Sequence, residues 1–298
     1  MIRRLLRWAG RAAGLLTGAY LFAVAFRGSH VLVRPQVRPF LPDVEGAPAT
    51  PADLGLEYEP VRFTTDDGVT LSGWLVPAAR ETRTAVIVLH GFSGHRLPEL
   101  AALVPWLQAR HHVLQFDFRG HGESGPGSVT LGAHERRDVA AAVRFLESRG
   151  LGPLALFGIS MGAAIAIDSA PDLPVAAVIA DAPFAELRHP IANRMRQIGY
   201  PLATVGARLV VAGVALRTRS RLPDPISVVG RIAPRALLLI APQGDQLISW
   251  HQSEKLFAAA GEPKELFVVP DAGHAEAYVV GPEAYRSRVL DFLERHLG

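Results

Sequence analysis

Hydrophobic and polar residues alternate along two neighbouring segments of this chain, YEPVRFTT and VTLSGWLVP, which begin at residues 58 and 69. Alternation with a period of two is typical of a strand that buries one face. The turn sequence DDG, residues 66–68, joins the two segments and predicts a β-hairpin. The next hydrophobic segment, Thr84–His90, is a continuous run, which favours a strand buried on both faces of a parallel sheet.

Strand-like and helix-like patterns then alternate down to the C-terminal end. The predicted strands cover residues 112–118, 154–159, 175–181, 235–242 and 264–270. The predicted helices cover residues 97–110, 132–149, 161–170, 250–260 and 284–296. Strands that alternate with helices form a parallel sheet with helices on both faces. We therefore expect an α/β fold with a mostly parallel, doubly wound sheet, in which the hairpin places an antiparallel strand near one edge.

One segment interrupts this alternation, at about residues 184–233, and it is longer than an ordinary connection between elements. It contains the apolar, helix-like stretch Tyr200–Leu216. Arg208 lies in the middle of that stretch, and a charge at the centre of a membrane span is costly. The pattern therefore predicts a helical lid insertion over a pocket.

The N-terminal segment, residues 1–34, combines a basic start with the uncharged run Ala12–Phe26. This run is shorter than the roughly 20 residues that span a bilayer, although flanking arginines can reach the interface. The bulky Phe22 and Phe26 and the adjacent Arg27 favour an uncleaved membrane anchor. A cleaved signal peptide, with an A-x-A site at residues 23–25, and an amphipathic helix remain as alternatives.

Positive charge is concentrated in this N-terminal part. Residues 1–38 hold seven arginines and no acidic residue, which leaves 24 basic against 28 acidic residues, a net charge of −4, for the rest of the chain. No basic stripe with interleaved aromatic residues follows, so we do not expect nucleic-acid binding. Four arginines precede the apolar run and three follow it, which orients an anchor with its N-terminus inside and the body outside the cytosol. Cleavage would instead release a secreted protein.

Composition separates the remaining chain into a linker and one domain. Residues 35–60 contain six prolines, which predicts an extended linker over residues 35–56. The remainder, residues 57–298, suits a single large α/β domain. Hydrophobic residues make up 49% of the chain and charged residues 20%, as in globular proteins. The absence of cysteine excludes disulfides, zinc thiolates and a cysteine nucleophile.

A serine between two glycines marks the strand-to-helix transition in ALFGISMGAA, residues 155–164. Ser160 has Gly158 and Gly162 two residues to either side, which is the G-x-S-x-G pattern of a nucleophile elbow. Such a turn is tight and projects the hydroxyl beyond the carboxyl end of the strand. Side chains at the glycine positions would collide where the strand and the helix approach each other. Ser160 is therefore the predicted nucleophile.

A serine nucleophile requires a base, which is commonly a histidine oriented by an acid. Four histidines follow Ser160 in the chain: His189, His251, His274 and His296. His274 lies just after the last predicted strand, at the sheet edge that carries Ser160, and is the predicted base. Asp245 follows the strand before it and is the predicted acid. Asp181, which ends an earlier strand, is kept as the reserve acid, whereas Asp271 is too close to His274 in the chain to orient it.

Backbone amides are expected to bind the oxyanion that forms on the attacked carbonyl. The amide of Met161 directly follows the nucleophile, and the amide of Phe92 lies in the glycine-rich loop after the strand at residues 84–90. His90 precedes the nucleophile in the chain and is expected to hold this loop in place. No phosphate-binding loop, dinucleotide fingerprint or metal-ligand pattern occurs, so no cofactor and no metal are expected.

The motifs HGFSGH, DFRGHGESG, GISMGAA, PQGDQLIS and DAGHAEAY occur in this order, and with them residues 57–298 resemble the α/β-hydrolase superfamily. They are similar to its oxyanion loop, structural loop, nucleophile elbow, acid turn and histidine loop. The resemblance implies that Asp117, Arg119 and His121 fix the structural loop. The acid turn lacks the histidine-glycine pair of many relatives, and the lid matches no subfamily.

These observations predict a serine hydrolase that cleaves a carboxylic ester or thioester through an acyl-enzyme. The apolar lid and the anchor favour a lipid-like or other hydrophobic acyl substrate. A serine peptidase of the prolyl-oligopeptidase kind would share the same triad but usually carries a further large domain. A binding protein that keeps the fold without catalysis normally has an incomplete triad. The sequence leaves the oligomeric state open.

Overall fold

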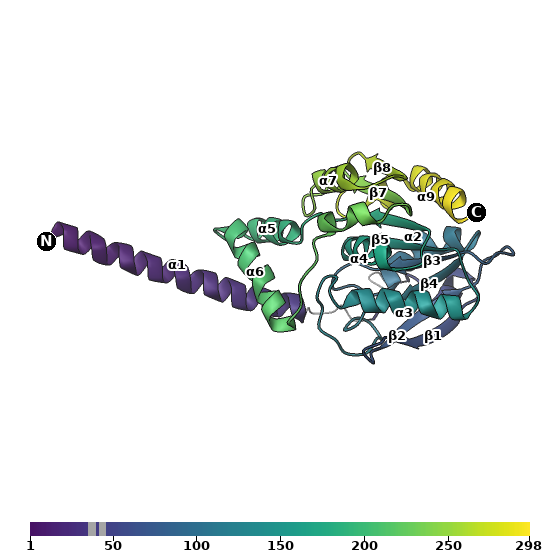
Figure 1. Ribbon diagram of the computed structural model, residues 1–298, viewed down its shortest axis with the longest axis horizontal. Coiled ribbons are helices and arrows are strands. Elements are labelled where there is room, and N and C mark those ends of the chain that lie inside the picture. The colour runs from purple at the N-terminus through teal and green to yellow at the C-terminus, as the bar shows by residue number, and fades with distance from the viewer. Residues whose placement is uncertain (35–39, 42–45) are drawn as a thin grey trace.

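A computed structural model describes residues 1–34, 40–41 and 46–298. Within these residues, eight strands form one sheet in the order β1-β2-β4-β3-β5-β6-β7-β8 (Figure 1). The strands are β1 Glu59–Thr64, β2 Thr70–Val76, β3 Ala85–Leu89, β4 His112–Phe116, β5 Leu154–Ile159, β6 Ala177–Asp181, β7 Ala236–Pro242 and β8 Lys264–Val269. Strand β2 runs antiparallel to both β1 and β4, and the other neighbours are parallel. The predicted fold class is confirmed, including the antiparallel strand beside one edge.

Helices cover both faces of the sheet, so the central strands are buried on both sides. The helices of the described chain are α1 Ile2–Val33, α2 Leu97–Gln108, α3 Glu135–Ser148, α4 Met161–Ser169, α5 Arg188–Gln197, α6 Ala203–Thr218, α7 His251–Ala259, α8 Ala277–Val280 and α9 Pro282–Leu297. In β3, Ile87 belongs to the core cluster under α3, α4 and α7. Its neighbours Val86 and Val88 belong to the cluster under α2 and α9. The predicted elements match these within a few residues at their ends.

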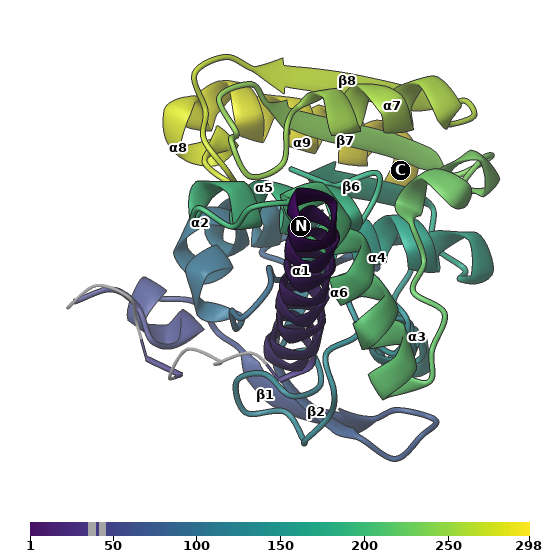
Figure 2. The same ribbon diagram turned by 90° about the vertical axis from the view of Figure 1, so that its left-hand side faces the viewer.

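The segment between β6 and β7 contains α5 and α6, which stand away from the sheet on its carboxyl side (Figures 1 and 2). We call these two helices and the turn between them the cap. Their buried residues form a small core of their own with α1: Val24 of α1 packs with Met195 of α5 and with Ala207 and Val210 of α6. The cap is therefore joined to the N-terminal helix as well as to the sheet.

Glycine residues bring α1 and α6 close together. A Cβ atom on Gly28 would lie 2.6 Å from Cγ2 of Val210, and one on Gly213 would lie 2.8 Å from Oγ of Ser29. Arg217 of α6 donates to the Ser29 hydroxyl at 2.8 Å, and its guanidinium group lies over the ring of Phe26. The second half of α1 is thus packed against α6, whereas its first half projects from the body (Figure 1).

Among the described residues, one helix is long and apolar enough to cross a membrane, Arg3–Val33, and its apolar stretch is almost entirely exposed. Residues 35–39 and 42–45 of the predicted linker lie outside the described residues. Phe40 packs edge-on against Trp74 of β2. Residues Pro51–Leu54 form a short 3₁₀ helix that begins with a capping box between Thr50 and Asp53. The end of the linker segment therefore has local structure and contacts the body.

Candidate active site

Ser160 occupies the turn between β5 and α4, and its backbone is strained. Its φ of 54° and ψ of −110° lie in a region that non-glycine residues rarely adopt. A Cβ atom on Gly158 would lie 2.2 Å from the carbonyl oxygen of Gly162, and one on Gly162 would lie 2.1 Å from that of Leu89 in β3. The first collision is the predicted one between strand and helix, and the second arises because α4 also begins against the end of β3.

The structure brings Ser160, His274 and Asp245 into one hydrogen-bonded chain. His274 Nε2 lies 2.9 Å from Ser160 Oγ, and His274 Nδ1 lies 2.6 Å from Asp245 Oδ2. The Asp245 side chain is fully buried, while 26% of the His274 side chain is exposed. The other carboxylate oxygen, Asp245 Oδ1, accepts the amides of Leu247 and Ile248 at 2.8 Å each. Both carboxylate oxygens are therefore engaged, and one of them faces the imidazole.

The reserve acid, Asp181, has a different partner. It ends β6 and is 3% exposed, and its Oδ2 accepts the Tyr285 hydroxyl of α9 at 2.7 Å. Burial is the main cause that raises the pKa of Asp181, to about 7, against the smaller opposing effects of Tyr285 and His274. Tyr285 is fully buried against Phe157 and is a residue that the sequence analysis missed. No local pattern marks it, because its partner lies 104 residues away in the chain.

Replacing Asp181 by asparagine should change how the stability depends on pH. An aspartate titrates at about 3.9 when unfolded, so between about pH 4 and pH 7 the folded state holds a proton that the unfolded state has lost. The free energy of unfolding of the native protein should therefore fall by about 1.4 kcal/mol per pH unit as the pH rises through this window. The Asp181→Asn variant should lack this contribution to the pH dependence. Urea unfolding of both proteins at about pH 5 and about pH 7 measures the difference. A difference that does not change with pH would contradict a protonated Asp181.

The loop after β3 lies against the nucleophile and contains the predicted donor Phe92. A Cβ atom on Gly91 would lie 3.7 Å from the Cβ of Ser160. The backbone amides of Phe92 and Met161 donate no hydrogen bond to another residue in the part of the chain described here. His90 holds the loop as predicted: its Nδ1 lies 2.8 Å from the carbonyl oxygen of Gly91, and its Nε2 accepts the amide of Phe118.

Arg96, at the end of the same loop, is a second residue that the sequence analysis missed. It is 2% exposed and forms an ion pair with Asp117, which also accepts the amide of Arg96 at 2.9 Å. Its guanidinium carbon lies 4.0 Å from the ring centroid of Trp74 and 4.4 Å from that of Phe40. This aromatic sandwich fixes the loop that carries Phe92. Asp117 belongs to the structural loop, so these contacts join the structural loop to the loop of Phe92.

Arg119 and His121 also contribute to the structural loop. Arg119 forms ion pairs with Asp67 of the hairpin turn and Asp138 of α3, and is 3% exposed. Burial is the main cause that raises the pKa of Asp138, to about 7, although Arg119 opposes it. The buried His121 packs edge-on against His90. These contacts link the hairpin, the loop after β4 and α3 behind the candidate site.

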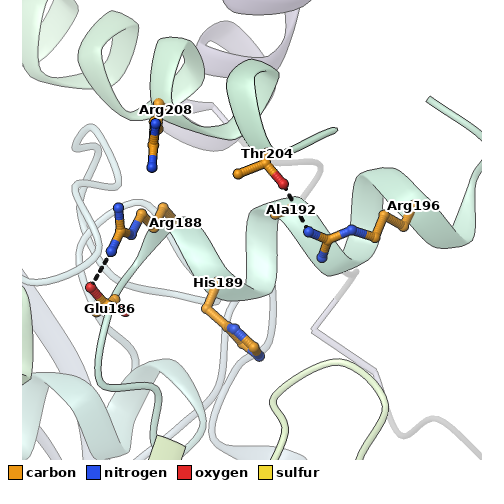
Figure 3. A pocket seen from close by; sticks show the side chains of 7 residues that line it. All are labelled: Glu186, Arg188, His189, Ala192, Arg196, Thr204 and Arg208. Carbon is orange, nitrogen blue, oxygen red and sulfur yellow. Dashed lines mark hydrogen bonds and ion pairs between the residues drawn. The ribbon is translucent and has the colours of Figure 1, made fainter. Parts of the chain in front are cut away.

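The cap contacts the turn that carries the predicted acid. Asn193 of α5 donates to the carbonyl oxygen of Leu247 at 3.0 Å and lies 3.0 Å from Nε2 of His189. A polar cavity of about 250 Å³ lies between α5 and α6 (Figure 3). It is lined by Glu186, Arg188, His189, Ala192, Arg196, Thr204 and Arg208. The single carboxylate of this lining pairs with Arg188, so the cavity has an excess of positive charge.

A sheet of this order, with a serine in the strained turn after β5, defines the α/β-hydrolase class. The chain belongs to the Hydrolase_4 family, described as "Serine aminopeptidase, S33", which matches residues 80–229. The match includes Ser160 and the loop of Phe92 and ends before Asp245 and His274. The proximity of these last two residues to Ser160 is therefore an observation of the structure itself.

Two bacterial relatives extend the similarity over most of the chain. "Uncharacterized protein YfhR" of Escherichia coli K12 is 30% identical over 247 residues, which cover 79% of this chain and 80% of the relative. "Uncharacterized protein Rv2307c" of Mycobacterium tuberculosis H37Rv is 34% identical over 242 residues, which cover 78% of this chain and 76% of the relative.

Solved structures show the same fold. The esterase Pf2001 of Pyrococcus furiosus has a TM-score of 0.74 and 30% identity, with coverage of 88% of this chain and 99% of the esterase. The α/β hydrolase GrgF of Penicillium has a TM-score of 0.66 and 25% identity, with coverage of 81% and 99%. Family and neighbours together identify the chain as a hydrolase of the α/β-hydrolase fold.

Proposed function

We propose that the protein is a serine hydrolase that cleaves a carboxylic ester or thioester through an acyl-enzyme. The observation that carries this proposal is the position of His274, between Ser160 Oγ at 2.9 Å and Asp245 Oδ2 at 2.6 Å. Both distances are within hydrogen-bonding range, so His274 can take the serine proton while Asp245 stabilises the resulting imidazolium.

The reaction would proceed in two halves. Ser160 Oγ attacks the carbonyl carbon, His274 accepts its proton, and the amides of Phe92 and Met161 bind the oxyanion. His274 then gives the proton to the leaving alcohol or thiol, and the acyl group remains on Ser160. Water then attacks the acyl carbon and loses a proton to His274. The bond to Ser160 Oγ breaks, His274 returns the proton to this oxygen, and the acid leaves. The strained backbone of Ser160 holds its hydroxyl in the position for attack.

An aminopeptidase is the second candidate, because the family is described by that activity. An aminopeptidase has to bind the α-ammonium group of its substrate, for which a free carboxylate beside the site is the suitable partner. The cap cavity has the opposite balance, with three arginines and one carboxylate that is already paired. A substrate group that enters this cavity would be anionic rather than an ammonium group, which supports the proposed hydrolysis of an ester or thioester.

A comparison of two substrate series separates the esterase activity from the aminopeptidase activity. We expect the full-length protein to hydrolyse p-nitrophenyl esters and to leave aminoacyl-p-nitroanilides intact. A series of p-nitrophenyl esters of increasing acyl length, followed by absorbance of the released nitrophenolate, gives kcat/KM for each. Release of nitroaniline from the aminoacyl substrates with the higher kcat/KM would establish the peptidase instead. If neither series reacts and fluorophosphonate fails to label Ser160, the fold acts as a binding protein.

We further propose that α1 anchors the protein in a membrane, with the catalytic body outside the cytosol. The exposure and length of α1 support this location, and the arginines at both ends of its uncharged run suit the two interfaces. The packing of its second half on α6 supports an anchor that is retained, because cleavage after Ala25 would leave only residues 26–33 on α6. A mature N-terminus at Phe26 would show a signal peptide and a secreted enzyme.

A further inference from the structure

A second, larger cavity, of about 490 Å³, lies between α1 and the cap. Its walls are mainly apolar and include Ala23 and Val31 of α1, Ile191 and Ile198 of α5, and Val210 of α6. We call it the anchor groove. Ile191 of its wall also packs against the main core cluster of the body. The groove therefore lies between α1 and the cap, and one of its walls is joined to the body of the protein.

The level of this groove along α1 follows from a hydrogen bond. The Tyr20 hydroxyl donates to the carbonyl oxygen of Pro201 at 2.9 Å, and Pro201 lies in the turn between α5 and α6. Tyr20 is within the uncharged run Ala12–Phe26, which is about 22 Å long as a helix and shorter than the roughly 30 Å hydrocarbon core. Tyr20 is near the middle of this run, so if the run is in a bilayer, the turn of the cap lies at the depth of the hydrocarbon core.

The composition of the turn fits such a position. Residues 198–207 contain no charged side chain, and arginines follow on both sides, at Arg196 and Arg208. Within this turn and the start of α6, Ile198 is 56% exposed and Leu202 is 52% exposed. Exposed apolar residues that cluster in this way mark an interaction surface, and flanking arginines can reach the phosphate level of a membrane.

The groove also carries positive charge at its walls. Arg27 of α1 and Arg194 of α5 both line it. Neither forms an ion pair with a residue in the described ranges. An apolar cavity with unpaired guanidinium groups is complementary to an amphiphile that has an acyl chain and an anionic head.

We propose that the anchor groove binds the acyl chain of an anionic membrane lipid, which enters sideways from the bilayer and whose headgroup pairs with Arg27 and Arg194. This inference rests on the membrane location in the proposed function and does not depend on catalysis. The N-terminal helix is then both the anchor and one wall of a lipid site.

The test uses full-length protein carrying Ser160→Ala, so that no lipid is consumed. The protein is reconstituted in phosphatidylcholine vesicles that contain phosphatidic acid with a photoactivatable diazirine on its acyl chain. After irradiation, mass spectrometry of peptides locates the adducts. We expect adducts on α5, around Ile191–Ile198, in addition to those on α1. Adducts that are confined to α1, or absent from both helices, would overturn the proposal, as would cross-links between two protein copies at this groove.

A variant that fills the groove separates binding from accidental contact. Val31 is 49% exposed and lines the groove, so Val31→Trp adds bulk without disturbing a packed core. It should reduce the adducts on α5 by about tenfold or more, because the indole ring takes the space of the acyl chain, whose burial stabilises the complex. Labelling near Leu5 in the projecting half of α1 should stay unchanged. The matched control is Val279→Trp on α8, at a valine that is 75% exposed, and equal loss in both variants would overturn the proposal.

Two further measurements test the headgroup and the level of the turn. The double variant Arg27→Gln and Arg194→Gln should abolish the preference for the phosphatidic acid probe over its phosphatidylcholine analogue, and a preference that persists would refute the role of these arginines. The chain has no cysteine, so Leu202→Cys provides a unique site for a fluorophore. Quenchers within the bilayer should quench this label and spare one at Val279→Cys. Equal quenching at both sites would refute the placement of the turn.

Discussion

Ser160→Ala should abolish covalent labelling by a fluorophosphonate and lower the rate of ester hydrolysis by about 10⁴-fold or more. The hydroxyl that it removes is the group within 2.9 Å of the imidazole of His274. Alanine keeps the Cβ atom in the strained turn, so the fold should persist. Labelling is read from gel fluorescence, hydrolysis from nitrophenolate release, and folding from circular dichroism and the melting temperature.

The same helix provides a matched control for this variant. Ser169, at the end of α4, is 2% exposed, and its hydroxyl has no hydrogen-bond partner within the described part of the chain. Ser169→Ala should therefore label and hydrolyse as the native protein does. Stoichiometric labelling of Ser160→Ala would show that another residue is the nucleophile, and equal losses in both variants would point to a damaged helix.

Asp245→Asn should lower the rate of ester hydrolysis nearly as much as Ser160→Ala does, because it reverses the tautomer of His274. Asp245 Oδ1 accepts the amides of Leu247 and Ile248, so the carbonyl oxygen of an asparagine stays at that position. Its NH₂ group then faces His274 Nδ1, which has to accept a hydrogen bond and leaves the proton on Nε2. An imidazole in this form cannot take the proton of Ser160. The equivalent change in a chymotrypsin-type triad lowers kcat by about 10⁴-fold.

Asp181→Asn is the matched comparison, since it makes the same chemical change at the other candidate acid. Its carboxylate accepts a hydrogen bond from Tyr285, and asparagine retains an acceptor there. We expect it to keep most of the native kcat/KM while it alters the stability with pH. Both variants are assayed with the same ester and monitored by melting temperature. If Asp181→Asn is the more damaging of the two, the catalytic acid is Asp181.

Strand positions and the place of the predicted nucleophile could be read from the sequence because local pattern determines both. The central strands, such as Ala85–Leu89, are buried on two faces and so consist of apolar residues without interruption. Ser160 was predicted as the nucleophile from Gly158 and Gly162, and both positions require glycine because backbone atoms in and next to the turn leave no room for a Cβ atom. His274 followed from chain order, since it lies just after the last strand at the edge where the parallel strands end.

Such patterns favoured Asp245 as the acid but did not exclude Asp181. Asp181 and Asp245 both follow strands of the same sheet, and both could approach the base. The structure places Asp245 beside His274 and turns Asp181 toward Tyr285, which comes from α9. The deciding contacts are between segments far apart in the chain, and their geometry depends on how strands and helices pack together.

In the N-terminal helix, too, the sequence determined some features and the tertiary structure decided others. Its sequence determined that residues 12–26 are uncharged and helix-compatible, and an apolar run of this kind is equally suited to lipid or to another helix. Only the tertiary structure decided that Gly28 of this helix meets Val210 of α6, which lies more than half the chain away. The apolar sequence predicts that this surface is buried, because burial of apolar area is favourable against any apolar partner. Which surface covers it is decided by shape, and shape exists only once the chain has folded.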